Sequence, residues 1–471
     1  MIPLIFSPCE IVEKEGSFCF SGTVTALGNG CLSEPVISEF WRGFTFQNSE
    51  LQIRETEDYI FSIGKAEVPA TDGYAYAINV EKEGFCLAAE NRQNLLQGFM
   101  TLLDRIRPAD TDGELLLDCC LIKDAPSIPN RMVHFCIFPE TELWELQRFI
   151  RLCGALKYTH IILEFWGMLQ FDCMQELSWR QGFTKEQIRP LIAETNALGM
   201  EVIPMFNHWG HASAGRVRYG KHVVLDQNPK LQNFFSDDGW CWAIEKPKVK
   251  ALLRQIRNEL IELCGSGNYF HIGCDEAYNF DLSCTESMDA ICDYINEVAR
   301  ELWEQGRETI IWGDMFLYRY PHYNPKNYYY CNAPSPECER YMLDRLCKDV
   351  IIADWQYHAG EAPVETSAVF AKAGFQCLIC PWDRSVSKLT SCLQTAKDKG
   401  LMGVLHTTWH TLSRGMPFVT MAAGGSYDGS LCIKENAAYK TATAALLRKV
   451  FPSKGDYRKA GWSKEQLGDM D

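Results

Sequence analysis

The chain has neither the long apolar runs of a membrane protein nor the basic surplus of a nucleic-acid-binding protein. No stretch of about 18 uninterrupted apolar residues occurs, which argues against a transmembrane helix. The formal net charge of −15 at pH 7 repels phosphate groups, so we expect no nucleic-acid or membrane partner. The N-terminal segment MIPLIFSPCEIVEKEG lacks a basic start and a long apolar run, so we expect no signal peptide and a cytoplasmic location.

Metal-binding and redox motifs are also missing. There is no His-Glu-x-x-His sequence, and the one Cys-x-x-Cys, Cys377 to Cys380, lies within an apolar run without a second pair. Twenty-one cysteines without an export signal indicate reduced thiols rather than a disulfide framework. The pairs His208/His211 and His406/His410 offer metal ligands, but no motif supports them. We therefore expect no metal and no cofactor.

The length and composition favour one large domain together with a smaller one. The chain has 471 residues, of which 46% are hydrophobic. The prolines of the segment KDAPSIPN mark a boundary, so we predict a small N-terminal α/β domain over residues 1–125 and a barrel over residues 126–471. Alternating stretches in the first domain predict strands at Tyr74–Val80, Phe85–Ala89 and Leu115–Ile122. This domain shows no nucleophile or ligand cluster, so we expect a structural role for it.

After Arg131 the pattern alternates between apolar strands and amphipathic helical stretches. Eight such units over the remaining residues predict a (β/α)8 TIM barrel. The predicted strands are Met132–Phe138, Thr159–Phe165, Glu201–Phe206, Tyr269–Ile272, Thr309–Trp312, Val350–Trp355, Gln376–Cys380 and Met402–Thr407.

The fourth predicted strand ends in two adjacent acids. Asp275 and Glu276 follow the apolar segment Tyr269–Ile272, at the carboxyl end of a barrel strand, where this fold places its chemistry. Neighbouring residues on a strand point to opposite faces, so both acids can serve one pocket only if the strand ends or turns there. Gly273 makes such a turn plausible. An Asp-Glu pair alone is usually a solvated surface feature, and its position in the barrel is what makes it a candidate site.

Aromatic and polar residues recur at the same rim. Tryptophans end or follow six of the strands, although a single tryptophan in such a place is more often packing than a ligand contact. Six at one rim indicate an aromatic-walled pocket that suits the C–H faces of a sugar, and acids among the polar groups point to carbohydrate hydrolysis. The tryptophans are Trp166, Trp209, Trp312, Trp355, Trp382 and Trp409, and the polar groups are Arg131, Glu164, Asn207, His211, Asp275, Glu276, Asp314, Tyr357, Asp383 and His406.

The segment HIGCDE, Asp275 and Glu276 included, resembles the His-x-Gly-x-Asp-Glu motif of glycoside hydrolase family 20, the β-N-acetylhexosaminidases. Its cysteine is most similar to the hexosaminidase D branch. Four further segments resemble the family at the start of the barrel and at its third, fifth and sixth strands: IKDAPSIPNR, VIPMFNHWGH, IIWGDM and IIADWQY. GFCLAAENRQNLLQGFMTLLD is similar to the small α/β domain that precedes the family's barrel.

The resemblance implies a retaining hydrolysis in which the substrate's 2-acetamido oxygen attacks the anomeric carbon. Glu276 would be the general acid, with a pKa raised by the tryptophan-walled pocket, and Asp275 would accept the acetamido N–H. Tyr357 would donate to the acetamido oxygen, and Arg131 would bind hydroxyls away from the cleaved bond. The resemblance implies that the other contacts come from Glu164, His211, Trp312, Asp314, Trp355, Trp382 and Trp409.

Three departures from the family pattern concern the substrate contacts. Cys136 stands where most members have an aspartate, Glu164 is the only acid of a strand that usually carries a His and an Asp, and Asn207 replaces a frequent acid. Gln356 also separates Trp355 from Tyr357, two residues that are often adjacent in the family.

Three functions follow from these residues. The first is an exo-acting β-N-acetylhexosaminidase that removes terminal GlcNAc or GalNAc from small glycosides or oligosaccharides. The second is a conventional two-carboxylate glycosidase in which Glu164 or Asp314 lies about 5 Å from Glu276. The third is a carbohydrate-binding barrel without activity. The sequence leaves the sugar preference, the linkage and the oligomeric state open.

Overall fold

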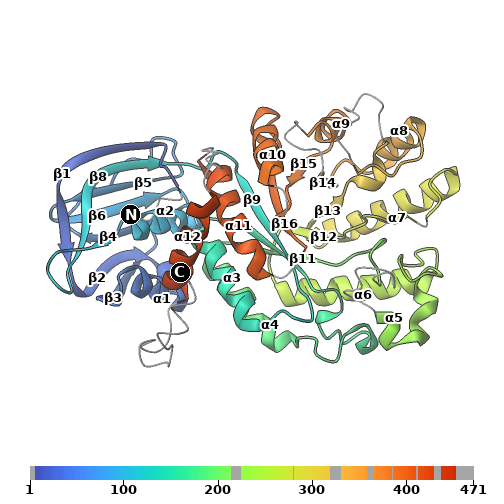
Figure 1. Cartoon of the computed structure of the whole chain (residues 1–471), viewed down its shortest axis with the longest axis horizontal. Helices are drawn as coiled ribbons and strands as arrows, with labels where there is room; N and C mark the ends of the chain where they lie inside the picture. The colour runs from blue at the N-terminus through green and yellow to red at the C-terminus, as the bar shows by residue number, and fades with distance from the viewer. Residues whose placement is uncertain are drawn as a thin grey trace. The chain divides into compact units, whose positions relative to one another are not determined.

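The computed structural model describes residues 6–213, 224–278, 280–318, 330–357, 364–383, 386–409, 412–428 and 436–451. These residues form two compact units (Figure 1). The first comprises Met1–Ala125, Arg151–Leu156 and Asn436–Asp471, and the second Pro126–Ile150 and Lys157–Glu435. The main segment of the first unit ends at Ala125, but this unit also takes in Arg151–Leu156 and Asn436–Asp471, which lie within the range predicted for the barrel.

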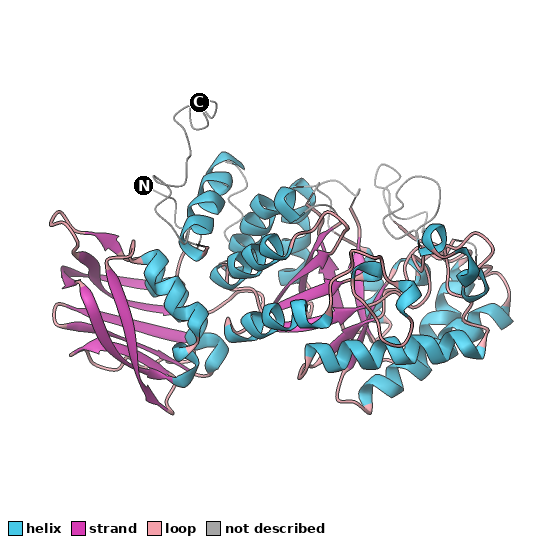
Figure 2. Ribbon diagram, turned by 90° about the horizontal axis from the view of Figure 1, so that it is seen from below, coloured by secondary structure: helices cyan, strands magenta, loops and turns pink. Residues whose placement is uncertain are grey.

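The first unit is an eight-stranded sheet with helices on one face (Figure 2). Its strands run in the order β1-β8-β5-β6-β4-β2-β3, and β7 pairs with β8. The bounds are β1 Glu10–Phe20, β2 Gly22–Asn29, β3 Ser49–Thr56, β4 Ile60–Gly64, β5 Tyr76–Glu81, β6 Gly84–Ala89, β7 Arg107–Pro108 and β8 Leu115–Asp124. The helices are α1 Pro35–Phe44, α2 Arg92–Asp104 and α12 Asn436–Val450.

Helix α12 was predicted to belong to the barrel but groups with the first unit. Its contacts are with α1, whose apolar face buries Phe40, Trp41 and Phe44. The close approach is visible at Gly43, where a side chain would collide with the backbone of Lys449. Burial of apolar surface therefore joins the two ends of the described chain within one unit.

The second unit is a closed barrel of eight parallel strands, which confirms the predicted fold class. Each predicted strand is present within two residues of its expected bounds. The strands are β9 Asn130–Cys136, β10 His160–Glu164, β11 Glu201–Met205, β12 Tyr269–His271, β13 Glu308–Trp312, β14 Ile351–Trp355, β15 Cys377–Cys380 and β16 Gly403–Thr408. The helices between and after them are α3 Leu143–Ala155, α4 Lys185–Ala197, α5 Val224–Gln227, α6 Pro247–Cys264, α7 Thr285–Trp303, α8 Pro336–Arg345, α9 Thr366–Lys372, α10 Val386–Asp398 and α11 Leu412–Tyr427.

The barrel interior is filled by large apolar side chains. Met132, Ile162, Ile203, Ile310 and Leu405 belong to one buried cluster, which extends to Trp312, Trp355 and Tyr357 at the carboxyl ends of the strands. Strands buried on both faces need near-continuous apolar sequences, which is why these strands were easy to recognise. Aromatic residues at the top of this core form the floor of the site described below.

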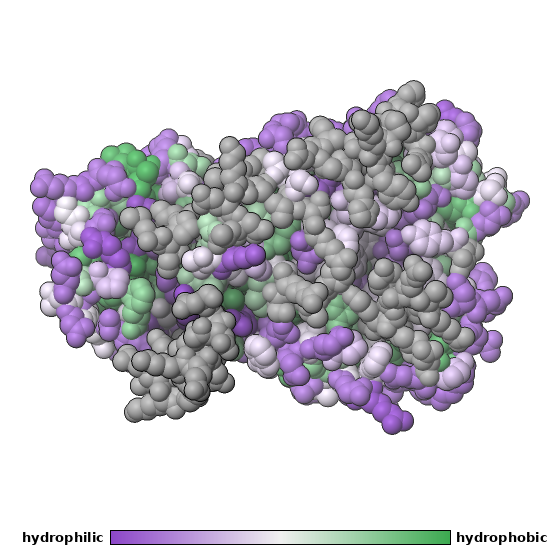
Figure 3. Space-filling view, in the orientation of Figure 1, coloured by the Kyte–Doolittle hydropathy of each residue, from purple (hydrophilic) through white to green (hydrophobic). Residues whose placement is uncertain are grey.

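Hydrophilic side chains cover most of the described surface seen in Figure 3, and hydrophobic residues gather only in small patches. No helix in the described part of the chain has the length and apolarity needed to span a bilayer.

Candidate active site

Asp275 and Glu276 lie side by side in one pocket because the chain turns sharply after β12. Gly273, Cys274 and Glu276 have positive φ angles of 69°, 77° and 50°. Such angles are costly for residues other than glycine, and they concentrate at functional sites. A side chain at position 273 would collide with the amide of Asn207, so the turn requires glycine there. The local sequence therefore delivers two neighbouring carboxylates to the same side.

His211 bridges the two acids. Its Nε2 lies 3.0 Å from the Glu276 carboxylate and 3.5 Å from that of Asp275. His211 also has a positive φ, 53°, and the adjacent Gly210 lies against the backbone of Asp275. The loops that follow β11 and β12 are thus packed together, and they form one group of three titratable side chains.

The pKa of Glu276 is shifted in the direction opposite to the one predicted. Burial raises the pKa of Glu276, but hydrogen bonds from His211 and Tyr278 and the charge of His211 outweigh it, so the pKa lies below its ordinary value. Burial raises the pKa of Asp275 well above its usual range, and the His211 charge offsets this only in part. Burial lowers the pKa of His211, yet the two acids raise it to about 9. The predicted rise at Glu276 is therefore wrong for the substrate-free protein, because the tryptophan-walled pocket also contains a cation.

Asp314 holds the backbone of Glu276. Its Oδ2 accepts hydrogen bonds from the Glu276 N–H at 3.0 Å and from the Asn332 side chain at 2.8 Å. Its Oδ1 accepts the indole N–H of Trp355 at 3.1 Å. Burial raises the pKa of Asp314 to about 7. The structure thus places Asp314 beneath the acids, where it orients other groups rather than lying open to a ligand.

Tyr357 and three tryptophans form an aromatic cluster next to Asp314, which accepts the indole N–H of one of them, Trp355. The Tyr357 hydroxyl accepts the indole N–H of Trp409 at 2.7 Å and lies 3.0 Å from the Thr407 hydroxyl. Its ring lies 5.0 Å from those of both Trp355 and Trp382. The Thr407 hydroxyl donates to the carbonyl of Pro381, so the Tyr357 proton is directed to Thr407 or to a bound ligand.

Trp312 lies deeper than the other aromatic residues. It is fully buried, with its ring 4.4 Å from that of His271 and 5.6 Å from that of Trp409. It supports the floor of the pocket, whereas Trp355, Trp382 and Trp409 form its wall.

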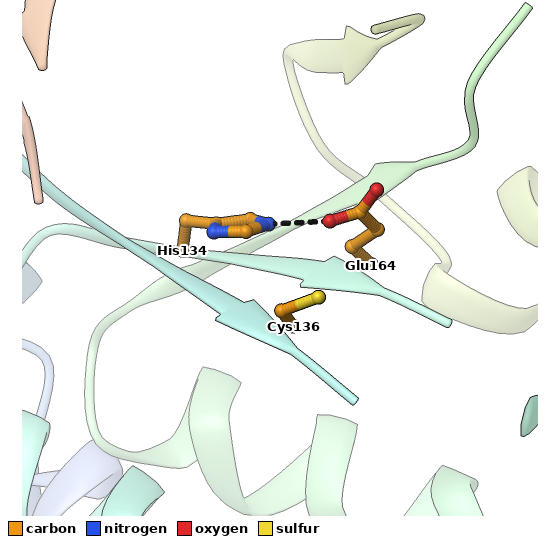
Figure 4. A group of neighbouring side chains, drawn as sticks. All are labelled: His134, Cys136 and Glu164. Carbon is orange, nitrogen blue, oxygen red and sulfur yellow. Dashed lines mark hydrogen bonds and ion pairs between the residues drawn. The ribbon is translucent and has the colours of Figure 1, made fainter. Parts of the chain in front are cut away.

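Glu164 lies at the floor of the site, and both of its carboxylate oxygens accept hydrogen bonds. It is fully buried and accepts hydrogen bonds from His134 at 2.8 Å, from Asn207 at 2.7 Å and from the indole of Trp166. Figure 4 shows His134, Cys136 and Glu164 on the adjacent strands β9 and β10. Their ligand atoms lie within 4.8 Å of one another, the one group in the described residues with the composition of a metal site. Both carboxylate oxygens of Glu164 already accept N–H groups, whereas His134 Nδ1 has no hydrogen-bond partner among the described residues.

Arg131 does not lie in the site. Its guanidinium is 1% exposed and donates to the carbonyl groups of Ile128, Pro129 and Lys157, and it lies over the ring of Tyr427. These groups surround the amino-terminal end of β9, whereas the acids follow the carboxyl end of β12. The expectation that Arg131 binds sugar hydroxyls is therefore not met, because backbone carbonyls use its donors.

The histidine pairs considered as metal ligands are also separated. His208 is buried, with Nδ1 2.6 Å from the Phe206 carbonyl and Nε2 3.0 Å from Arg257. It is therefore a structural residue behind the site, unlike His211. His406 is buried beside Tyr158 and Phe418, and His410 lies outside the described residues.

Four site residues were missed by sequence reasoning: His134, Trp240, Tyr278 and Asn332. Trp240 donates its indole N–H to the Glu276 carbonyl at 2.6 Å, and its ring is tilted against that of His211 with the ring centres 4.4 Å apart. Tyr278 follows Glu276 by two residues, a spacing that could have pointed to it. Trp240 and Asn332 lie in long irregular segments whose course has no periodic signal in the sequence.

A parallel α/β barrel whose carboxyl rim holds paired acids in an aromatic pocket has the architecture of the glycoside hydrolase class. Residues 163–383, a little less than half of the chain, match the family model "Glycosyl hydrolase family 20, catalytic domain", and this part of the chain is similar to that family.

Curated relatives resemble parts of the chain. A β-hexosaminidase from Akkermansia muciniphila is 26% identical over 252 residues, which are 48% of this chain and 49% of that protein. A lacto-N-biosidase from Bifidobacterium bifidum is 20% identical over 309 residues, 62% of this chain and 25% of that protein. The chain thus spans half or less of the length of these two relatives.

Solved structures resemble nearly all of the chain. The family 20 exo-β-N-acetylglucosaminidase from Vibrio harveyi, in complex with N-acetylglucosamine, has a TM-score of 0.69 at 15% identity, and the match covers 95% of this chain and 77% of that one. The Streptomyces plicatus N-acetyl-β-hexosaminidase has a TM-score of 0.66 at 13% identity, with coverage of 93% and 94%. At these identities the likeness concerns the fold.

Proposed function

We propose that the protein is an exo-acting, retaining β-N-acetylhexosaminidase that removes terminal GlcNAc or GalNAc from small glycosides or oligosaccharides. The observation that carries this proposal is the placement of Asp275 and Glu276 in one pocket with a single imidazole, 3.5 and 3.0 Å away. Two carboxylates in different environments can perform two different tasks. The names of the Akkermansia and Vibrio relatives support the substrate class.

In the first step Glu276 gives a proton to the glycosidic oxygen as its bond to the anomeric carbon breaks. His211, with a pKa of about 9, is an imidazolium at neutral pH and serves as the proton reserve beside Glu276. The 2-acetamido oxygen attacks the anomeric carbon and forms an oxazolinium-type intermediate. The leaving group departs with the proton.

Asp275 and Tyr357 act on the acetamido group during this attack. The positive charge that develops on the acetamido group favours the ionised form of Asp275, which accepts the acetamido N–H and stabilises that charge. The Tyr357 hydroxyl donates to the attacking oxygen. The Oδ1 atom of Asp275 has no hydrogen-bond partner among the described residues, so it is available to a ligand. In the second step the Glu276 carboxylate takes a proton from water. The water oxygen attacks the anomeric carbon as the bond from that carbon to the acetamido oxygen breaks, and the acetamido group is restored with net retention.

The two-carboxylate alternative needs a second acid that is free to attack the sugar. Glu164 accepts three N–H groups, and Asp314 accepts three as well, one of them from the Glu276 backbone. Attack by either acid would leave buried donors without partners, at a cost of about 1–3 kcal/mol each. This cost favours the acetamido group as the nucleophile.

We also propose a cytoplasmic location. The twenty cysteines in the described part of the chain are free thiols, which suits a reducing compartment. Fractionation of the source cells, with detection of the protein by an antibody, tests this point. Recovery in the secreted fraction would contradict it.

The purified protein tests the activity with matched nitrophenyl β-glycosides of GlcNAc, GalNAc and glucose. We expect hydrolysis of the acetamido sugars alone and inhibition by a thiazoline that mimics the cyclic intermediate. Equal cleavage of the glucoside would reject substrate assistance. Turnover of none of the three, in protein whose folding is verified by circular dichroism, would favour a carbohydrate-binding role.

A further inference from the structure

Three side chains of different chemistry meet at the carboxyl ends of two neighbouring barrel strands (Figure 4). His134 and Cys136 are two residues apart on β9, so they point to the same face, and Cys136 is paired in register with Glu164 of β10. Met132 and Ile162 lie on the same faces of these strands and belong to the buried core of the barrel. The imidazole, the thiol and the carboxyl group therefore all point into the barrel.

The group is compact and closed to solvent. A ring nitrogen of His134, Cys136 Sγ and a carboxylate oxygen of Glu164 lie within 4.8 Å of one another. Each of the three residues is at most 1% exposed. In a tetrahedral zinc site, bonds of about 2.0–2.3 Å place the ligand atoms about 3.3–3.8 Å apart. Side-chain rotations of about 1 Å therefore suffice to close this group around one ion.

The fold leaves part of the hydrogen-bonding capacity of this group unused. A carboxylate has about four acceptor positions, and Glu164 receives three N–H groups, from His134, Asn207 and Trp166. Because His134 Nε2 is the donor to this carboxylate, Nδ1 carries the lone pair of the neutral ring. This Nδ1 atom has no hydrogen-bond partner among the described residues. The group thus retains acceptor positions that no described residue fills.

The combination of donor atoms selects the kind of ion. A thiolate and an imidazole are ligands of zinc and other thiophilic metals, whereas magnesium and calcium require oxygen ligands. A divalent cation with one thiolate, one carboxylate and one neutral imidazole forms a set without net charge, which suits a fully buried position. The thiol proton passes to the solvent when the ion binds. Three protein ligands leave one position of a tetrahedral ion open.

Glu164 connects this group to the paired acids. Its carboxylate accepts the side-chain N–H of Asn207 at 2.7 Å, and the Asn207 amide lies directly against the turn at Gly273 that brings the acids together. The ring of His134 lies 4.6 Å from that of Trp409, a member of the aromatic cluster. An ion that draws Glu164 and His134 together therefore displaces groups that support the acids and the aromatic cluster.

We propose that His134, Cys136 and Glu164 form a binding site for a thiophilic divalent cation, zinc in the first place, and that the bound ion slows hydrolysis. No single segment of the sequence contains this set of ligands, because Glu164 comes from the strand after His134 and Cys136. The expectation that the protein binds no metal considered only motifs within one segment and pairs of histidines. The effect on hydrolysis rests on the proposed function, whereas the binding of the ion does not.

Metal binding is tested on the full chain, which is kept reduced, freed of metal with a chelator and loaded with a single equivalent of zinc or cobalt(II). X-ray absorption of the zinc-loaded wild type should show one sulfur ligand at about 2.3 Å, with nitrogen and oxygen ligands at about 2.0–2.2 Å. The cobalt-loaded wild type should show a thiolate-to-metal charge-transfer band.

Variants identify the ligand. Cys136→Ser should lose the charge-transfer band and bind zinc about 100-fold more weakly, since changes to residues behind a metal ligand already cost about 10–100-fold. Cys292→Ser is the matched control, because it changes an equally buried cysteine on α7, and it should leave the band and the affinity unchanged. Circular dichroism verifies that both variants are folded.

The same proteins test the effect on hydrolysis. Zinc should inhibit the wild type on nitrophenyl β-GlcNAc, and a chelator should restore the rate. Half-inhibition of Cys136→Ser should need at least about tenfold more zinc than half-inhibition of the wild type or of Cys292→Ser, in line with its weaker binding.

The outcomes separate the metal site from the activity. A zinc spectrum of the wild type without a sulfur ligand would overturn the site, and so would a charge-transfer band of full strength in folded Cys136→Ser. Zinc that binds through Cys136 without slowing hydrolysis would overturn the inhibitory effect alone. A wild type that hydrolyses no N-acetylhexosaminide even without zinc would overturn the proposed function and the inhibition with it, while the spectra still decide the site.

Discussion

Two buried charged groups at opposite ends of the barrel, Arg131 and Asp275, use their hydrogen-bonding atoms differently. At the amino-terminal end, the Arg131 guanidinium meets three backbone carbonyls, and its hydrogen-bonding capacity serves the fold. At the carboxyl end, Asp275 Oδ1, Asn207 Oδ1, His134 Nδ1 and Trp312 Nε1 have no partner among the described residues. Unpaired buried atoms also occur elsewhere, Thr309 Oγ1 at the amino-terminal end of β13 among them, but Asp275 Oδ1 belongs to the pair of acids, where a donor of a ligand could meet it. The Arg131 guanidinium thus has its partners within the fold, whereas the Asp275 carboxyl group keeps one unpaired oxygen.

The largest expected effect follows a change at the turn that brings the acids together. Gly273→Ala would force a Cβ against the Asn207 amide at a φ of 69°. We expect kcat/KM on nitrophenyl β-GlcNAc to fall by about 100-fold, because small displacements of catalytic groups have effects of this size. Gly306→Ala is the matched control, since Gly306 has a similar φ of 75° but open space around it. Equal losses of kcat/KM in the two variants would show that the turn at Gly273 has no special role in catalysis.

Replacement of His211, the cation beside the two acids, should alter the pH dependence of kcat/KM. The pKa of His211 is raised to about 9, so the imidazolium persists below pH 9 and is lost as the pH rises through that value. We expect the wild-type kcat/KM to fall on its basic side near pH 9. In His211→Gln the only proton donor is Glu276, whose pKa is then governed by burial, so the basic limb should move to lower pH.

The same variant should lose about tenfold or more of its activity at pH 7. Rate profiles between pH 5 and 10 check both expectations. A basic limb that stays near pH 9 in His211→Gln would show that another group provides it.

We expect a smaller loss of kcat/KM from a change at Asp314, which holds the backbone of Glu276. Asp314→Asn replaces the oxygen that accepts the Glu276 N–H, so we expect kcat/KM to fall by about tenfold through misplacement of Glu276. Asp354→Asn changes an equally buried acid that binds Thr366 and Gln356 instead. It should lower the melting temperature but leave kcat/KM of the folded protein within about twofold. A larger kinetic loss at Asp354 than at Asp314 would contradict the assignment.

The smallest kinetic effect belongs to the amino-terminal end. Arg131→Lys should leave KM and kcat of the folded protein unchanged, while the free energy of unfolding in urea falls by about 2–4 kcal/mol, because lysine cannot reproduce the forked contacts. Arg340→Lys, in an exposed ion pair with Glu337, should change neither. A higher KM for Arg131→Lys without loss of stability would show that Arg131 contacts the substrate after all.

The sequence predicted the barrel well because its strands are buried on both faces and stand out as apolar runs. It did not predict the strands β1–β4 of the first unit, since β1 exposes most of its side chains and its composition resembles that of a loop. Helix α12 was assigned to the wrong unit because its partner α1 lies about 400 residues earlier, a contact that no local pattern reveals.

The candidate site was predictable where one segment provides it. Asp275 and Glu276 are adjacent in sequence, and the strand before them identifies their position. The error at Arg131 arose because the sequence shows where a residue lies on a strand, but not which carbonyls surround it. The pKa direction of Glu276 was wrong because it depends on the imidazole of His211, 65 residues away.

The central claim is that Asp275 and Glu276, although neighbours, perform different tasks. The most direct measurement compares Glu276→Gln and Asp275→Asn on two β-GlcNAc glycosides, one with a methyl leaving group and one with a dinitrophenyl leaving group that needs no proton. We expect Glu276→Gln to lose about 100-fold or more on the methyl glycoside and to recover most activity on the dinitrophenyl glycoside. Asp275→Asn should lose activity on both, because both require the acetamido group. Equal losses for the two variants on the two substrates would contradict the separate roles.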